Sequence, residues 1–132
     1  MKKSKTLKKE AFTLIELVIV IAIIAVLIAI AVPKYQQSNL SAQAAAHNAN
    51  VRMLKNAGIL YLTDNPQHTG AISQEDLAPY LEEGKFPIPA KIGEGTEPGS
   101  FQVTESNGDI LVQPGSVEID KTSKTLVESA GQ

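Results

Sequence analysis

The longest apolar segment of the chain lies near its N-terminus. Sixteen consecutive residues from Leu17 to Val32 are apolar, and between Phe12 and Val32 only Thr13 and Glu16 are polar. A helix rises about 1.5 Å per residue, so about 20 apolar residues span the hydrocarbon core of a bilayer. The pattern therefore predicts a transmembrane helix over residues 12–33.

A second helical pattern runs from residue 34 to residue 62. Pro33 precedes it and should kink or loosen the helix, because proline lacks a backbone donor and clashes with the preceding turn. One strip recurs at alternating spacings of four and three: Leu40, Ala44, His47, Val51, Leu54 and Gly58. A second strip consists of Ala46, Met53, Ala57 and Leu60. Two strips suit a helix that packs on its own domain and on neighbouring helices.

Short segments with turn signals follow this helix. Turn formers in residues 63–70 end it, and Ser73, three residues before Asp76, predicts a capping box for a short helix. Residues 84–100 are rich in glycine and proline and indicate a loop, in which any strand near residues 86–88 would be an edge strand.

The C-terminal part predicts short antiparallel strands. "SFQVTE" and "DILVQ" flank Asn107-Gly108, a strong hairpin signal, and Pro114-Gly115 makes a turn before "SVEID". The tail "KTSKTLVESAGQ" adds a last extended piece or stays mobile. The expected fold is α+β, with a long N-terminal α-helix, apolar in its first half and amphipathic in its second, packed on a small C-terminal antiparallel sheet of about three to four strands.

Charge is distributed unevenly over the 132 residues. Residues 1–11 hold five lysines and one acidic residue, Glu10, whereas the remainder holds seven basic and thirteen acidic side chains, a net of −6. The lysines should stay in the cytoplasm, which places the downstream domain outside the membrane. The acidic body argues against nucleic acid as the main partner. Cysteine is absent, which excludes disulfides and thiolate metal sites.

An uncleaved signal anchor or a secretory signal peptide would also begin with lysines and an apolar run. The run is longer than the apolar region of a signal peptide and lacks a clear A-x-A cleavage site. Neither alternative explains Glu16, because carboxylates inside a membrane are costly and usually have a partner. If the chain were cut between Ala11 and Phe12, the new amine would lie one helical turn from Glu16 and could neutralise it.

The N-terminal segment combines a lysine-rich leader, a small residue, "FTLIELVIVIAIIAVLIAIAVP" and Tyr35. This combination resembles the class III signal and N-terminal helix of type IV pilins and pseudopilins. The resemblance implies that a membrane peptidase cuts before Phe12 and methylates its amine. Glu16 falls on the family's conserved glutamate, which pairs with the amine of an adjacent subunit, and Pro33 on its helix proline. Ala11 departs from the glycine that usually precedes the cut.

The resemblance also implies a domain organisation and a set of partners. The expected parts are a leader peptide (1–11), a membrane and filament-core helix (12–33), an amphipathic helix (34–62) and a small globular head (63–132). The subunit would be a single-pass membrane protein with a cytoplasmic N-terminus and then part of an extracellular homopolymer, a helical filament. Its other partners would be the prepilin peptidase, which is also the methylase, and an inner-membrane assembly platform.

The leading hypothesis is a structural subunit of a type IV pilus, not an enzyme and without a cofactor. The alternative within the family is a major pseudopilin of type II secretion or of competence. The resemblance implies a tryptophan in the first group and often a cysteine pair in the second, and the chain has neither. The absence of cysteine favours a Gram-positive or other non-disulfide lineage. A membrane-anchored DNA or substrate receptor is disfavoured, because the basic residues of the body are widely spaced.

Candidate metal and catalytic residues are sparse. We interpret His47 as a helix-face histidine with a local hydrogen bond, and His68 lies in a turn. Asp109, Glu118 and Asp120 could meet on a small sheet and hold calcium, although scattered carboxylates on a solvated face are the commoner explanation. "GEGTEPG" lacks the ending of a phosphate loop.

Overall fold

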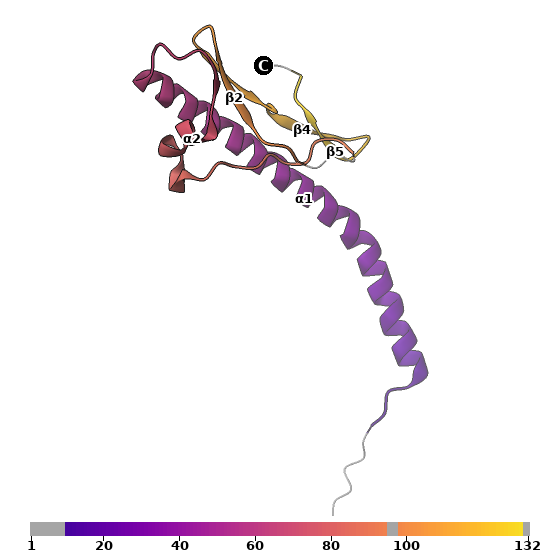
Figure 1. Ribbon diagram of the computed structural model, residues 1–132. Coiled ribbons are helices and arrows are strands. Elements are labelled where there is room, and N and C mark those ends of the chain that lie inside the picture. The colour runs from indigo at the N-terminus through magenta and orange to yellow at the C-terminus, as the bar shows by residue number, and fades with distance from the viewer. Residues whose placement is uncertain (1–9, 95–97, 131–132) are drawn as a thin grey trace, which may run out of the picture. The chain divides into compact units, whose positions relative to one another are not determined.

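The computed structural model describes residues 10–94 and 98–130. Its longest element is α1, Leu14–Asp64, which has 51 residues (Figure 1). The chain divides into two compact units between Gln36 and Gln37. The fold class predicted from the sequence is confirmed: a long N-terminal helix whose second half packs on antiparallel strands.

The first half of α1 has only exposed side chains, from Leu14 to Gln36. The helix continues through Pro33. In a helix each carbonyl usually accepts a hydrogen bond from the N–H four residues later. Because Pro33 has no N–H, the carbonyl of Ala29 lacks this hydrogen bond. A kink at this position stays a prediction.

The second half of α1 buries the predicted first strip. His47, Val51, Leu54 and Gly58 are buried, and Leu40 and Ala44 at its start are half-buried. The second strip is divided: Ala57 belongs to the core and Met53 packs against it, whereas Ala46 and Leu60 are exposed. The side of α1 that carries Ala46 and Leu60 therefore has no partner among the described residues of this chain.

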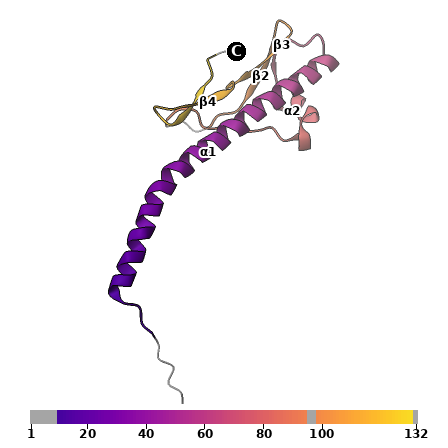
Figure 2. The same ribbon diagram turned by 180° about the vertical axis from the view of Figure 1, so that it is seen from behind.

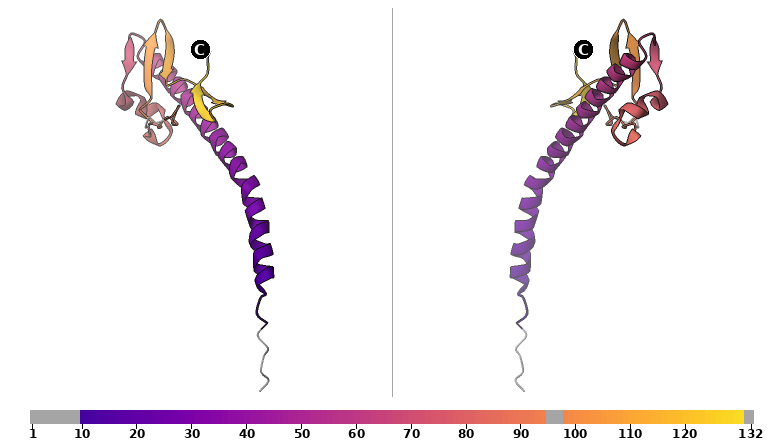
Figure 3. Two further views of the ribbon diagram at one scale, coloured as in Figure 1. Left: turned by 90° about the vertical axis from the view of Figure 1, so that its right-hand side faces the viewer. Right: turned by 90° about the vertical axis from the view of Figure 1, so that its left-hand side faces the viewer.

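The strands form two sheets instead of the one sheet expected. β1 (Gly70–Ile72), β2 (Gln102–Ser106) and β3 (Asp109–Gln113) make an antiparallel sheet in the order β1-β2-β3. β4 (Val117–Asp120) and β5 (Thr125–Glu128) form an antiparallel pair of their own. Figures 2 and 3 show both sheets along the second half of α1.

One detail of the sequence prediction is wrong. Gly70, expected in the turn after the helix, begins β1, which pairs through Ile72 with Val103 of β2. Residues 86–88 form no strand and belong to the loop, as the glycine- and proline-rich sequence predicts. Ile72 and Val103 are both buried, so the contact between distant residues decides the strand at β1.

The local signals are confirmed. Asn107 and Gly108 have φ of 55° and 84° and connect the paired residues Ser106 and Asp109, as in a type I′ hairpin. Ser73 caps α2 (Gln74–Leu77) by accepting a hydrogen bond from the Asp76 backbone N–H at 3.1 Å. The short 3-10 helices η1 (Ala78–Tyr80) and η2 (Glu82–Gly84) follow α2.

The core lies between α1 and the three-stranded sheet. Its members are all buried: Val51, Leu54, Ala57, Ile72, Leu77, Leu81, Phe101, Val103, Ile110 and Val112. Gly58 allows a close approach of α1 to β3, since a Cβ there would meet Ile110 Cγ2 at 2.9 Å. Leucines of α2 and of the segment before η2 close the core at the C-terminal end of α1.

Candidate processing and assembly site

A reciprocal set of hydrogen bonds marks the start of α1. The Thr13 backbone N–H donates to Glu16 Oε2 at 2.7 Å, and the Thr13 hydroxyl donates to the same oxygen at 2.8 Å. The Glu16 backbone N–H donates in turn to Thr13 Oγ1 at 3.3 Å. This is a capping box, in which threonine is the N-cap and glutamate the third helical residue.

The capping box gives Glu16 a local partner that the hydropathy pattern does not reveal. In that pattern Thr13 is only a polar interruption, although the spacing Thr-x-x-Glu before an apolar run is itself a signal for a helix start. Both side-chain bonds end on Oε2, and among the described residues no hydrogen bond reaches Glu16 Oε1. The second carboxylate oxygen is thus available to another donor.

Ala11 and Phe12, the residues on either side of the expected cut, lie before the helix. Residues 10–13 have no regular secondary structure, and Phe12 is 88% exposed. The backbone between the two residues is therefore not enclosed in a helical turn.

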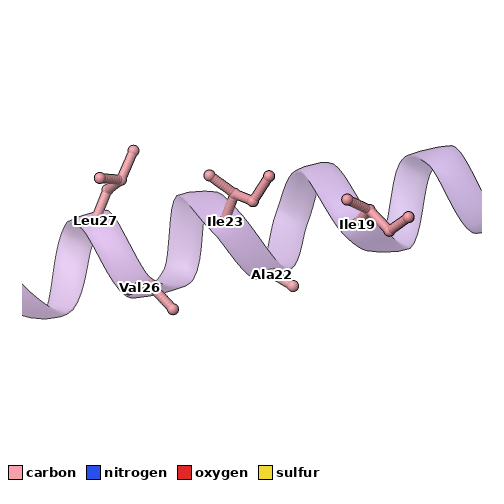
Figure 4. A pocket seen from close by; sticks show the side chains of 5 residues that line it. All are labelled: Ile19, Ala22, Ile23, Val26 and Leu27. Atoms are coloured by element: carbon pink, nitrogen blue, oxygen red, sulfur yellow. The ribbon is translucent and has the colours of Figure 1, made fainter.

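An apolar surface follows the capping box along α1. Ile19, Ile23 and Leu27 stand in one row at a spacing of four residues, with Ala22 and Val26 beside them (Figure 4). Each of the three large side chains is more than half exposed. Among the described residues, α1 is the one helix long and apolar enough to cross a membrane. Such a surface needs lipid or other apolar helices around it.

His47 has a structural role in the C-terminal unit. It is 1% exposed, and its Nδ1 accepts a hydrogen bond from the Ala90 backbone N–H at 3.0 Å. Nε2 therefore carries the proton and donates to the Gly115 carbonyl at 2.8 Å. The interpretation of His47 as a hydrogen-bonded histidine is confirmed, but its partners are distant in sequence and not local.

Asn48 is a structural residue that the sequence pattern does not single out. Its side-chain amide donates to the Val117 carbonyl at 2.9 Å and accepts from the Val117 N–H at 2.7 Å. The amide thus pairs with β4 as the backbone of a neighbouring strand would. His47 and Asn48 together fix the start of β4 and the turn before it to α1.

A group of polar aromatic residues lies near the C-terminal end of α1. His68 contacts the Tyr61 hydroxyl at 3.4 Å and the Ala71 carbonyl at 3.2 Å. The Tyr80 hydroxyl donates to Asp64 at 2.6 Å, and this bond raises the pKa of Tyr80 above its usual value. These contacts tie residues 68–80 to the helix end.

The three carboxylates considered for calcium do not come together. Asp109 lies on β3, and its Oδ1 accepts from the Ile110 backbone N–H at 2.9 Å. Asp120 lies at the end of β4, where the Thr122 backbone N–H and then the Ser123 hydroxyl lower its pKa. Within residues 10–94 and 98–130, no group of three histidine or acidic side chains could hold a metal ion.

Comparison with known proteins adds evidence for the N-terminal segment. A family model described as the prokaryotic N-terminal methylation motif matches residues 7–32, about a fifth of the chain. No curated protein and no solved structure matches the chain significantly. The matched residues include both sides of the expected cut, Glu16 and most of the apolar surface. Residues 7–32 therefore carry the prokaryotic N-terminal methylation motif, which supports the class III signal of a type IV pilin-like or pseudopilin-like protein.

Proposed function

We propose that this chain is the structural subunit of a type IV pilus filament. It is cut before Phe12, the new amine is methylated, and subunits assemble through the apolar first half of α1. The observation that carries the proposal is the methylation motif at residues 7–32 together with a helix that begins inside it and whose side chains are all exposed from Leu14 to Gln36.

The physical basis is an exchange of apolar neighbours. Before assembly, lipid surrounds the large apolar side chains that follow Glu16 in α1. In a filament, the same side chains contact helices of other subunits, so the apolar surface stays away from water in both states. The acidic C-terminal unit then coats the filament and remains hydrated.

Glu16 gives this assembly its register. Glu16 follows the proposed amine of Phe12 by four residues, and its Oε1 is available because the Thr13 bonds both use Oε2. An amine of an adjacent subunit that binds this oxygen neutralises a charge that the apolar filament interior would otherwise disfavour. Pro33, inside α1, is the second proposed assembly residue, where the missing N–H makes the helix easier to bend.

Three partners process and assemble the proposed subunit, which occupies two locations in turn. The prepilin peptidase cuts and methylates, an inner-membrane platform extracts the subunit, and further copies of the chain complete the filament. The subunit spans the cell membrane once, with its N-terminus in the cytoplasm, and lies on the cell surface after assembly.

Mass spectrometry of the surface protein tests the processing step. We expect a chain that begins at Phe12 and carries one added methyl group on its amine. A mature chain that still begins at Met1 would contradict the proposal.

Electron microscopy of producing cells tests the filament itself. Wild-type cells should carry surface filaments that cells with the gene deleted lack, and the purified filaments should contain this chain. A mature, methylated chain in cells without surface filaments would instead favour the pseudopilin alternative.

A further inference from the structure

The start of α1 lies very close to the proposed cleavage site. Thr13 is the N-cap of α1. Phe12 alone separates this N-cap from Ala11, so the proposed cut between Ala11 and Phe12 lies one residue before the cap. A helix that began a single turn earlier would enclose the scissile bond. The position of the helix start therefore decides the conformation of the cleavage site.

The residues before the cap do not by themselves stop a helix. Leu7, Lys8, Lys9, Glu10 and Ala11 all belong to the residue types with high helix propensity. Among residues 7–13 of the sequence, only Thr13 belongs to a residue type that is preferred at N-caps. The reciprocal bonds between Thr13 and Glu16 thus supply the stop signal that the preceding residues lack.

We propose that Thr13 is a positioning residue for cleavage of the leader. With Glu16 it fixes the start of α1 at Leu14 and keeps the backbone of Ala11 and Phe12 outside the helix, as an accessible substrate for the peptidase. This inference rests on the proposed function, because it assumes the cut before Phe12.

The chemistry of the cut explains why the helix start matters. Water adds to the carbonyl carbon of Ala11, the bond to the nitrogen of Phe12 breaks, and the nitrogen takes up a proton, which leaves a carboxyl group and an amine. In a longer helix the Ala11 carbonyl would accept the Ile15 N–H, and surrounding side chains would block its carbon. An extended substrate instead offers its backbone groups to the binding site of the enzyme.

The capping box and the assembly pairing of Glu16 are compatible. The Thr13 bonds occupy Oε2 before cleavage. After cleavage, the Phe12 amine of an adjacent subunit can approach Oε1. Glutamine also serves in a capping box, although it carries no charge. The Glu16→Gln variant therefore separates the role of Glu16 in processing from its proposed role in assembly.

Cleavage of the full chain in detergent micelles by a purified prepilin peptidase tests the inference. Thr13→Val removes the hydroxyl at nearly constant shape and should slow cleavage about fivefold, the effect of a lost N-cap on the helix equilibrium. Thr13→Ser and Glu16→Gln keep the capping box and should be cut at the wild-type rate. Equal rates for Thr13→Val and wild type would overturn the inference.

A double-mutant comparison separates helix position from direct recognition of the hydroxyl. Ala11→Gly lowers the helix propensity at the cut, so it should speed cleavage more in the Thr13→Val background than in the wild type. The Cα chemical shifts of Ala11 and Phe12 should also become more helical in Thr13→Val. Slow cleavage without that shift would overturn the inference, whereas a wild-type chain that is never cut before Phe12 would overturn the proposed function.

Discussion

At the scale of single residues, three polar side chains bond to backbone groups where an element begins. Thr13 and Glu16 bond to each other at the start of the apolar run, and Asn48 binds the backbone of β4. In each case a side chain satisfies backbone groups that would otherwise be left without a partner. Substitution of these side chains should therefore change cleavage, assembly or stability more than the small number of atoms removed would suggest.

Glu16→Ala should abolish filaments while the subunit accumulates in the membrane. In the proposed filament, the amine of Phe12 loses its partner, and breaking a buried pair typically costs about 3 to 5 kcal/mol. Membrane insertion itself becomes easier without the carboxylate. Immunoblots of membrane fractions and electron microscopy of filaments measure the two quantities.

Glu16→Gln is the matched control, because it keeps shape and hydrogen bonding but removes the charge. We expect it to be cut normally and to assemble poorly. If both variants built filaments at the wild-type level, Glu16 would have no role in assembly.

Asn48→Ala should destabilise the C-terminal unit by about 2 to 4 kcal/mol. The substitution leaves both the N–H and the carbonyl of Val117 without a partner, and Val117 is only 3% exposed. Urea unfolding of the full chain in micelles, followed by tyrosine fluorescence, measures the change. Asn56→Ala, at an exposed position of the same helix, should change the stability little, and an equal loss in the two variants would contradict the role of Asn48.

At the scale of elements, the packing of α1 on β3 depends on one glycine. Gly58→Ala would place a Cβ at 2.9 Å from Ile110 Cγ2. Overpacking of this kind costs about 1 to 3 kcal/mol, whereas alanine gains about 1 kcal/mol in helix propensity. We expect a net destabilisation of about 1 kcal/mol in the same unfolding experiment.

The cause of that loss can be tested through the partner side chain. In the Ile110→Ala background the new Cβ meets no isoleucine and fills part of a cavity. Gly58→Ala should therefore stabilise the protein in this background. A loss of the same size in both backgrounds would show that contact with Ile110 is not the cause.

At the scale of the whole molecule, the C-terminal unit should fold without the N-terminal half of α1. Residues 14–39 of the helix are exposed, whereas the core residues begin at Val51 and the polar anchors at His47. Removal of residues 1–38 should leave a soluble monomer. Its stability should be marginal, because the core is small and the chain has no disulfide.

Circular dichroism and analytical ultracentrifugation of this truncated chain measure its folding and its oligomeric state. Cooperative thermal unfolding of a monomer is the expected result. An unfolded or aggregated chain would mean that the C-terminal unit depends on the N-terminal segment or on assembly.

The sequence by itself determined the features that depend on near neighbours. The apolar run, the strip from Leu40 to Gly58 and the Asn107-Gly108 turn each encode their structure within a few residues, because helix periodicity and positive φ are local properties. The methylation motif is equally local, since the class III signal is contained within residues 7–32. The Thr13–Glu16 capping box is also local, because its spacing alone indicates a helix start, although the hydropathy pattern predicted the helix from Phe12 and did not single out Thr13.

Only the tertiary structure decided which segments meet. Strands of three to five residues carry too little pattern to select a partner, so their division into two sheets depends on contacts across the fold. Asn48 binds Val117, 69 positions away, and His47 binds Ala90 and Gly115. No local rule connects these residues, because each bond exists only after α1 has buried its apolar strip and brought the polar groups beside it to backbone that is distant in sequence.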